Sequence, residues 1–404
     1  MIMKEKEKDQ SSTVHVLKMS SYTAPPVIET ARGEWVEYGE DNNYFQYLID
    51  RYNGSPTNNA AVNGISEMIY GRGLEATNSE ENPEAYAAMR ELFKKDCMKK
   101  ICYDYKMMGQ AALQIIYSKD HSRIVQVEHI PIETLRAEKA TIGNVKGYYY
   151  HPNWQDMKRD EKPKRISAFG TSKDGIEIMY IRPYKAGFYY YSPVDYQGGL
   201  QYAELEEEIA NYHISNIQNG LQPSMLINFN NGTPSKEQRD DIERAIYEKF
   251  SGSSNAGRFI LAFNDSKELA ASIEPVMLND AHQQYQFLSD ESMKKVMVSH
   301  RIVSPMLVGI KDNSGLGNNA QELETASLLM DNTVIRPMQV TIIDGLEKIL
   351  EYNEIDLDLY FQTLQPLEFT DLTNALTDAE VEKETGVKPS QVKKEQEINE
   401  EIEE

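Results

Sequence analysis

Several residue types that mark particular protein classes are scarce in this chain of 404 residues. It has only two cysteines, Cys97 and Cys102, which are too few for a disulfide framework and fit a reducing compartment. Their spacing of five in a segment expected to be helical should keep the two thiols apart.

Basic residues are also few, since 42 Lys and Arg stand against 64 Asp and Glu, for a formal net charge of -22. This balance argues against a broad basic nucleic-acid interface, because neutralising phosphates needs clustered Lys and Arg, but it allows a protein that DNA slides past.

Long apolar runs are missing as well. No run approaches the roughly 18 apolar residues that would span a bilayer, and residues 1–13 lack the apolar centre of a secretory signal. We therefore expect no membrane partner, and a protein that is soluble and intracellular or part of a particle. Hydrophobic residues make up 40% of the chain, and 25 Tyr accompany only 2 Trp, a composition that suits a folded protein of two or three domains.

Motifs for catalysis and cofactor binding are absent. The sequence has no G-x-S-x-G elbow, no Rossmann fingerprint and no kinase motif set, and its seven His show no metal-ligand spacing. We interpret His300, beside Arg301, as a helix-end residue that interacts with the helix dipole. One acidic cluster lacks the Gly-turned loop of a calcium site and is interpreted as a solvated edge: Glu351, Glu354, Asp356 and Asp358. We expect no enzymatic activity, no cofactor and no metal.

One Gly-rich loop resembles a phosphate cradle. Residues Gly252 to Arg258 read GSSNAGR, and two Gly five apart can expose backbone N–H groups to an anion. A P-loop needs Lys and then Ser or Thr after its last Gly, between a strand and a helix, whereas here Arg258 opens a predicted strand. Turn geometry is the better interpretation, and a nucleotide- or sugar-handling enzyme that uses this loop is the alternative.

Hydrophobic periodicity predicts an α+β fold. Helices are expected over residues 58–70 (after a cap region at Ser55), 83–108, 200–217, 279–303 (stopped by Pro305) and 320–352 (kinked at Pro337). Strands are expected over 111–117 and 124–130, and short hairpins over 140–195. Two Tyr-rich runs in the hairpin region, 147–150 and 188–191, are expected to pack within the hairpins, because a base-stacking platform normally interleaves more Arg and Lys.

Residues 218–263 form a compact β-α-β insert between two long predicted helices. Apolar runs over 225–229 and 259–263 bracket a polar helix that begins near Ser235. Asn and Gly residues flank each element as turn formers. An insert of this kind is better suited to a protruding assembly element than to a catalytic pocket.

The order and spacing of these elements resemble tailed-bacteriophage portal proteins over residues 45–352. The motifs that carry the resemblance are Asn219-Gly220 with Pro223-Ser224 and the strand 225–229, residues 235–238, Gly252 with 255–258 and the strand 259–263, residues 283–288, residues 301–309, Glu322 with Glu324, and 335–337.

The resemblance implies a portal-like fold with an α+β wing, a two-helix stem, a β-α-β clip and a kinked C-terminal helix. The implied divisions are an N-terminal arm (1–35), the wing (36–196), stem helix 1 (197–218), the clip (219–275), stem helix 2 (276–303), a tunnel loop (304–319) and wing or short crown helices (320–377). Residues 378–404 hold ten acidic and four basic residues, net -6, and are expected to be a disordered tail.

It also implies a function and partners. Subunits would form a ring, expected to be a dodecamer, at one capsid vertex of the virion after assembly in the host bacterial cytoplasm. Double-stranded DNA would pass through the ring during packaging and ejection. The other partners would be the major capsid protein, the terminase large subunit and a head-tail connector or adaptor. A ring-forming adaptor that does not conduct DNA is a further alternative.

Two sets of site residues follow from the resemblance. The DNA tunnel is expected to include Lys294, Lys295, Lys311, Asn313 and Asn318, with an ordinary solvated side chain as the alternative for each lysine. Contacts between subunits or with the terminase are expected at Met225, Ile227, Phe229, Arg239, Arg258 and Phe259. Neighbouring subunits would pair the open strand edges of the clip.

Overall fold

The computed structural model describes residues 26–140, 144–158, 160–172, 175–218, 226–229, 260–263, 281–310 and 319–364, with the single positions 237 and 241. Several predicted features lie outside these residues: the arm up to residue 25, the loop 252–258, the acidic tail, and Met225, Arg239, Arg258, Phe259, Lys311, Asn313 and Asn318. The backbone of Ile227 and Phe229 is described, as part of strand β10.

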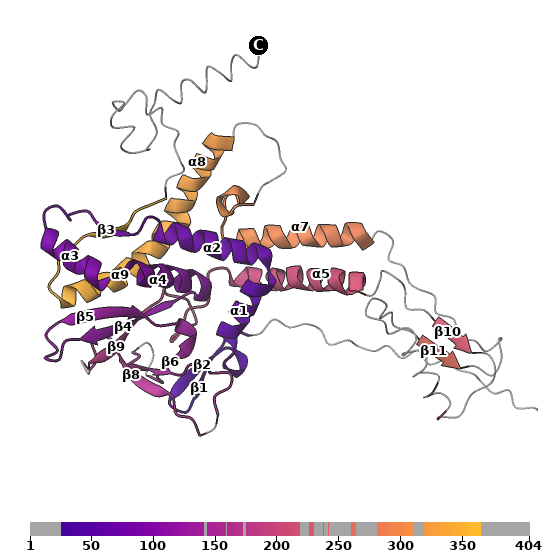
Figure 1. Cartoon of the computed structure of the whole chain (residues 1–404), viewed down its shortest axis with the longest axis horizontal. Helices are drawn as coiled ribbons and strands as arrows, with labels where there is room; N and C mark the ends of the chain where they lie inside the picture. The colour runs from indigo at the N-terminus through magenta and orange to yellow at the C-terminus, as the bar shows by residue number, and fades with distance from the viewer. Residues whose placement is uncertain are drawn as a thin grey trace, which may run out of the picture.

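A six-stranded mixed sheet lies at the centre of the body, our name for the described residues within 26–199 and 300–364 (Figure 1). The strand order is β5-β4-β9-β8-β7-β6, in which only β8 and β9 run parallel. The strands are β4 (Ala111–Tyr117), β5 (Ile124–His129), β6 (Leu135–Ala137), β7 (Gly147–Tyr150), β8 (Lys164–Ala168) and β9 (Ile176–Ile181). Both strands predicted over 111–130 are therefore confirmed.

Helices cover one face of this sheet and form the larger of two hydrophobic cores. Leu113 and Ile115 of β4 pack there with Ile65 and Ile69, whereas Ala112 belongs to the second core on the other face, as strand alternation requires. The helices of the body are α1 (Tyr44–Gly54), α2 (Pro56–Tyr70), α3 (Pro83–Leu92), α4 (Lys95–Met108), α8 (Asn319–Met330) and α9 (Arg336–Tyr352). Two small antiparallel pairs complete the body: β1 (Glu29–Arg32) with β2 (Trp35–Tyr38), and β3 (Leu74–Ala76) with β12 (Leu359–Phe361).

The single helix predicted over 83–108 is wrong. The chain forms α3 and α4 instead, because Phe93 and Lys94 leave the helical conformation, with backbone angles of φ -99°, ψ 76° and φ -61°, ψ 141°. The break turns the buried Phe93 side chain into the core. Neither residue is a helix breaker, so packing decides the break and no Gly or Pro announces it.

The two Tyr-rich runs have different structures. Residues 147–150 form β7, in which Tyr148 is buried and stacks on Tyr180 with ring centroids 4.7 Å apart. Packing, as predicted, accounts for this run. The second run is not a hairpin strand: the backbone N–H groups of Tyr189, Tyr190 and Tyr191 donate to the carboxylate of Glu29 at 2.8–2.9 Å, which takes the place of a strand partner.

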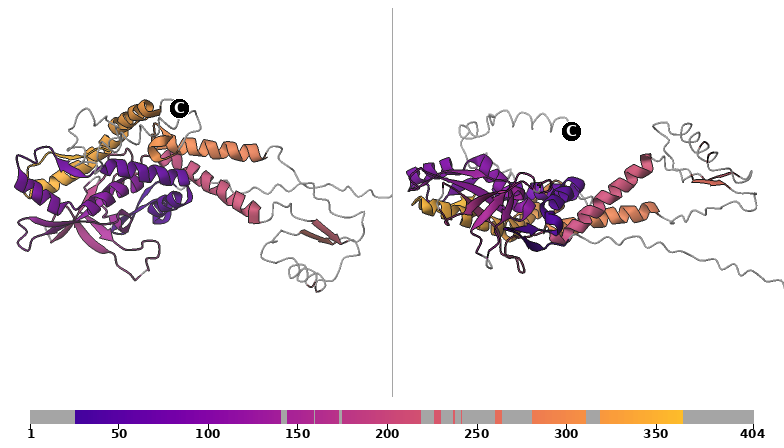
Figure 2. Two further views of the ribbon diagram at one scale, coloured as in Figure 1. Left: turned by 45° about the horizontal axis from the view of Figure 1, so that its top comes forward. Right: turned by 90° about the horizontal axis from the view of Figure 1, so that it is seen from below.

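Helices α5 (Leu200–Gln218) and α7 (Ala281–Ser299) project from the body as an antiparallel pair, which we call the stem (Figures 1 and 2). At the body, Gly199 faces Ser299. At the far end the rings of Tyr212 and Tyr285 stack with centroids 4.4 Å apart. A Cβ at Gly199 would come within 2.1 Å of Ser299 Oγ, so this position requires glycine. The helix predicted over 200–217 is confirmed.

The helix over 279–303 is shorter than predicted and Pro305 does not end it. Ser299 is its last residue, and the backbone N–H groups of Arg301 and Ile302 bond to the carbonyls of Val298 and Met297, both at 3.0 Å. This is the hydrogen-bond pattern of a Schellman cap. Pro305 instead begins a short 3-10 turn, Pro305–Val308.

The kink predicted at Pro337 is present, but it begins earlier. A π-helical turn, Asp331–Ile335, joins α8 to α9, and Pro337 lies in the first turn of α9. Proline is tolerated in a first helical turn, because the N–H groups there have no intrahelical partner. Pro337 has no N–H to donate to the carbonyl four residues earlier, that of Thr333.

Strands β10 (Leu226–Phe229) and β11 (Ile260–Phe263) form a separate two-stranded parallel sheet beyond the stem (Figure 1). Both strands of the predicted β-α-β insert are thus present. Parallel pairing needs a crossover connection of a dozen or more residues, and the 30 residues between Phe229 and Ile260 are long enough for one.

Candidate functional site: the stem and its junction with the body

Glutamates in the first turns of α5 anchor the stem to α1 and α2. The carboxylate of Glu206 accepts hydrogen bonds from the Ser55 hydroxyl, from the Thr57 hydroxyl at 2.7 Å and from the Thr57 backbone N–H at 3.3 Å. It therefore sits at the N-terminus of α2, where the exposed N–H groups favour an anion. Arg51 of α1 pairs with Glu207 at 3.1 Å and with Glu204 at 3.6 Å.

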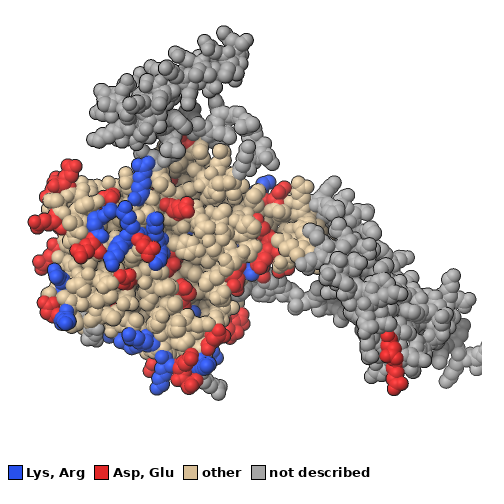
Figure 3. Space-filling view, viewed as in Figure 1, with Lys and Arg blue, Asp and Glu red and all other residues tan. Residues whose placement is uncertain are grey.

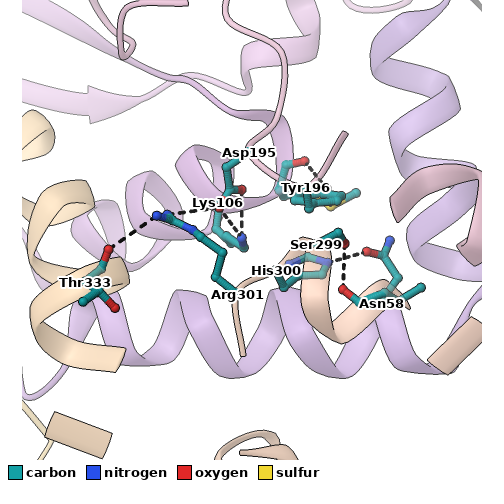
Figure 4. A network of polar contacts seen from close by, with 10 residues as sticks. Asn58, Lys106, Asp195, Tyr196, Ser299, His300, Arg301 and Thr333 are labelled. Atoms are coloured by element: carbon teal, nitrogen blue, oxygen red, sulfur yellow. Dashed lines mark hydrogen bonds and ion pairs between the residues drawn. The ribbon is translucent and has the colours of Figure 1, made fainter. Parts of the chain in front are cut away.

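At the other stem helix, His300 is fully buried just beyond the end of α7 (Figure 4). Its Nε2 lies 2.8 Å from Asn58 Oδ1 of α2, and its ring stacks on Tyr196 with centroids 4.2 Å apart. Because the amide oxygen only accepts, Nε2 carries the proton. Burial, and then the positive charge of Lys106, lower the pKa of His300 well below its ordinary 6.5. The residue is therefore a neutral histidine in the core, at the helix end predicted from the sequence.

Protonation of His300 should oppose folding. Its folded pKa is lowered, so below pH 6.5 the unfolded chain binds a proton that the native chain excludes. As the pH is lowered below 6.5, this group should therefore decrease the free energy of unfolding by up to about 1.4 kcal/mol per pH unit. We expect urea unfolding between pH 7 and 5 to show this slope in the native chain and not in His300→Gln, whose amide can still donate to Asn58. Equal slopes in the two proteins would contradict the assignment.

A buried ion pair lies beside His300. The Lys106 side chain is 0% exposed, and its Nζ lies 2.8 and 3.0 Å from the two carboxylate oxygens of Asp195, whose side chain is 21% exposed. Lys106 Nζ also lies 5.0 Å from the centroid of the Tyr196 ring. Burial lowers the pKa of Lys106, and the charge of Asp195 opposes that effect. The pair joins α4 to the segment that leads into α5.

Arg301 links the stem end to the π-helical turn (Figure 4). It has a left-handed backbone, φ 58°, in the cap position that usually holds Gly, which costs a side-chain-bearing residue about 1 kcal/mol. Its Nη1 donates to the Thr333 carbonyl at 3.4 Å, and its Nη2 lies 3.8 Å from Asp195. Thr333 is four residues before Pro337, so its carbonyl is the one that lacks a helical donor. Arg301 supplies that donor.

The outward face of α7 carries exposed apolar side chains. Phe287 is 66% exposed and Val298 is 70% exposed. They lie 11 residues apart, which places them about 20° from each other around the helix and about 16 Å apart along it. The opposite face holds Ser292, Val296 and His300, all buried against the rest of the molecule. Phe287 and Val298 therefore point directly away from the protein.

The two described tunnel candidates lie on or beside this face. Lys294 is exposed and lies on the same face, between Phe287 and Val298 along the helix axis; in the described part of the chain it has no ion-pair partner. Lys295 is exposed as well, and its Nζ pairs with Glu291 at 3.4 Å. Their contact with DNA stays a prediction. Helix α5 has an exposed apolar side chain as well, Ile214, which lies near the end of the helix that is farthest from the body.

The described ranges hold an acidic groove, but no arrangement of side chains suited to a metal ion and no membrane-spanning helix. No group of three or more His, Cys, Asp or Glu there is arranged to hold a metal ion. Glu351, Glu354, Asp356 and Asp358 line a groove of about 700 Å³ together with Lys348, consistent with a solvated acidic edge. Among the described helices, none combines the length and the apolar character needed to cross a bilayer.

The sequence did not reveal the junction residues. The run of glutamates in α5 was visible, but its partners Arg51, Ser55 and Thr57 lie about 150 residues earlier. The ion pair between Lys106 and Asp195 could not be predicted, because the two residues are 89 positions apart and no local pattern links them. Only Ser55 was noted, as a helix cap, and its Oγ does accept from Asn58 N at 3.1 Å.

Comparison with known proteins identifies the fold. No family model matches the sequence. An uncharacterized protein of Rickettsia bellii is 23% identical over 195 residues, 47% of this chain and 48% of the relative. One from Rickettsia felis is 27% identical over 171 residues, 40% and 42%. The matched regions thus span less than half of each of these relatives.

Solved structures cover far more of the chain. A chain in the neck of an empty gene transfer agent (GTA) particle, computed with C6 symmetry, matches 85% of this chain and 93% of its own length at a TM-score of 0.52 and 14% identity. The neck of the native particle, computed with C12 symmetry, also has a TM-score of 0.52 and 14% identity, over 85% and 89%. An HK97-family phage portal protein from Corynebacterium diphtheriae matches at 0.47 and 13%, over 81% and 98%. The chain has the fold of these particle-neck proteins, and the α+β, portal-like fold class is confirmed.

Proposed function

We propose that this chain is a portal protein, one subunit of a closed ring that forms the DNA channel at a single vertex of a phage or gene-transfer particle. The observation that carries the proposal is the stem, an antiparallel helix pair that projects from the body and leaves Phe287 and Val298 uncovered. Exposed apolar side chains on a projecting element suit a protein interface. The fold of particle-neck chains supports the same role.

The stem provides the two different surfaces that a head-to-tail ring requires. The outward face of α7 offers Phe287 and Val298, and the exposed side of α5 offers Ile214. Exposed apolar groups are thus available on both stem helices. In the proposed ring, α7 of one subunit packs on α5 of the next. Sixfold and twelvefold neck symmetries of the similar particles support a dodecamer.

The remaining assignments follow from this ring. Residues 36–196 would form the wing, β10 and β11 would belong to the clip, and residues 304–319 would form the tunnel loop. Lys294, Lys295, Lys311, Asn313 and Asn318 would contact DNA weakly, because a channel that bound phosphates tightly would stall translocation. Ile227, Phe229 and the other clip residues named above would contact neighbours or the terminase. The capsid protein and a head-tail connector are the further partners, in a virion assembled in the host cytoplasm.

Electron microscopy and native mass spectrometry of the purified full-length chain test this proposal. We expect closed rings with a central channel, of twelve subunits. A stable monomer that hydrolyses nucleotide would favour an enzyme that uses the loop 252–258. A further variant replaces residues 312–318 by a short linker. Normal filling of its particles with DNA would count against the tunnel loop. If the particles fill with DNA that does not pass through the ring, the chain is an adaptor.

A further inference from the structure

A groove of about 560 Å³ opens on the body between α2 and α4. Its walls include two tyrosines, Tyr70 and Tyr103, and two lysines, Lys99 and Lys100. Figure 3 shows Lys and Arg side chains gathered on this part of the body, near the end of α2. The groove thus combines aromatic walls with a basic rim, although the protein as a whole is acidic.

Lys99 is the charge available to a ligand. Its Nζ lies 5.4 Å from the centroid of the Tyr70 ring, and it has no carboxylate partner among the described residues. Lys100 is already paired with Asp96 at 2.6 Å. Two acids also line the groove: Asp104, which is hydrogen-bonded to His129 at 2.7 Å, and the exposed Glu67. An anionic partner would therefore be bound on the side of Lys99.

The chain itself supplies a segment at this groove. Leu364, the last residue of the described C-terminal range, lines the groove and is 41% exposed. The next eight residues lie outside the described ranges and read QPLEFTDL. Apolar residues Leu367 and Phe369 alternate with Glu368 in this stretch, and Pro366 favours an extended chain before it. Eight extended residues reach about 26 Å, far enough to cross a groove of this volume.

We propose that the groove binds residues 365–372 of the same chain. Leu367 and Phe369 pack against Tyr70 and Tyr103, and Glu368 pairs with Lys99 at the rim. The segment is tethered at Leu364, so its local concentration at the groove is in the millimolar range without any partner protein. Docking would fix the point at which the acidic residues 378–404 leave the body. This inference concerns a single chain and does not depend on ring formation.

Disulfide trapping tests the proposal in the full-length protein. We expect Lys99→Cys with Glu368→Cys to form a disulfide on mild oxidation, identified by peptide mass mapping; the natural cysteines, Cys97 and Cys102, are buried. The matched control, Lys99→Cys with Glu397→Cys, should form at least tenfold less. A mixture of isotopically light and heavy chains should give no light-heavy cross-link. Mixed cross-links, or equal yields in the two pairs, would overturn the proposal.

Hydrogen exchange gives a second readout without cysteines. Amides of residues 367–372 should exchange about tenfold faster in Phe369→Ser than in the native chain, and several-fold faster in Lys99→Glu. Leu376→Ser, an apolar-to-polar change farther along, should leave them unchanged. Slow exchange of the β4 amides, Leu113 and Ile115, verifies that each variant is folded. Unchanged exchange of 367–372 in folded Phe369→Ser would show that the groove does not hold this segment.

Discussion

Replacing both Phe287 and Val298 by Asp should abolish ring assembly and leave the subunit folded. Both side chains are mostly exposed in the single chain, at 66% and 70%, so their replacement should change subunit stability by no more than about 0.5 kcal/mol. In the proposed ring they are buried against a neighbour. A carboxylate there must be desolvated without a partner, which costs several kcal/mol at every interface. We expect at least a hundredfold weaker association, which is about 2.7 kcal/mol.

Sedimentation or native mass spectrometry at micromolar concentration measures this effect. Val125→Asp is the matched control, because Val125 is also exposed, at 44%, but lies on the edge strand β5 of the body. The control should retain the assembly state of the native chain. Intact rings in the double variant would show that this face of α7 does not contact a neighbour. If those rings also fail to fill with DNA, the face lines the channel together with Lys294.

Removing Asp195 should destabilise the body by about 3 kcal/mol. Lys106 is completely buried, so Asp195→Ala would leave its ammonium group uncompensated, and breaking a buried ion pair from one side typically costs about 3–5 kcal/mol. We take the lower end, because Asp195 is 21% exposed and water can enter beside it. The double variant Lys106→Met with Asp195→Asn should recover most of the loss, because no buried charge remains.

Tryptophan fluorescence reports this unfolding well. Both tryptophans, Trp35 and Trp154, lie in the body with ring centroids 5.6 Å apart, so their signal follows the body alone. The measurement should use the Phe287→Asp, Val298→Asp background, since ring assembly would otherwise add its own stabilisation. A single Asp195→Ala variant as stable as the double variant would show that water, and not Asp195, compensates Lys106.

The sequence predicted those elements whose pattern is local. The strand over 111–117 and the helix over 200–217 were found because alternation and helical periodicity are properties of neighbouring residues. The cap at Ser55 was found for the same reason. The ends of α3 and α7 were not, since Phe93 and Arg301 adopt non-helical conformations for tertiary reasons and lack the usual Gly or Pro.

The candidate site was predicted less well than the fold. The stem was located. Which face of α7 is exposed depends on how the body and α5 pack against that helix, and periodicity alone does not predict this packing. Lys294 and Lys295 were chosen for their charge, whereas Phe287 and Val298, on the same helix, were not noticed as surface residues. The sequence did not show that His300 is buried, because its contacts with Tyr196 and Asn58 come from distant segments.

The antiparallel stem has a consequence for how such proteins diversify. Because Tyr212 and Tyr285 stack on each other, the chain departs from and returns to the body through two helices that are already side by side. The intervening residues are thus an insertion whose ends are closed by the stem, and lengthening such a loop twofold adds only about 0.6 kcal/mol of closure entropy. Selection can therefore exchange or resize that segment while the body stays unchanged.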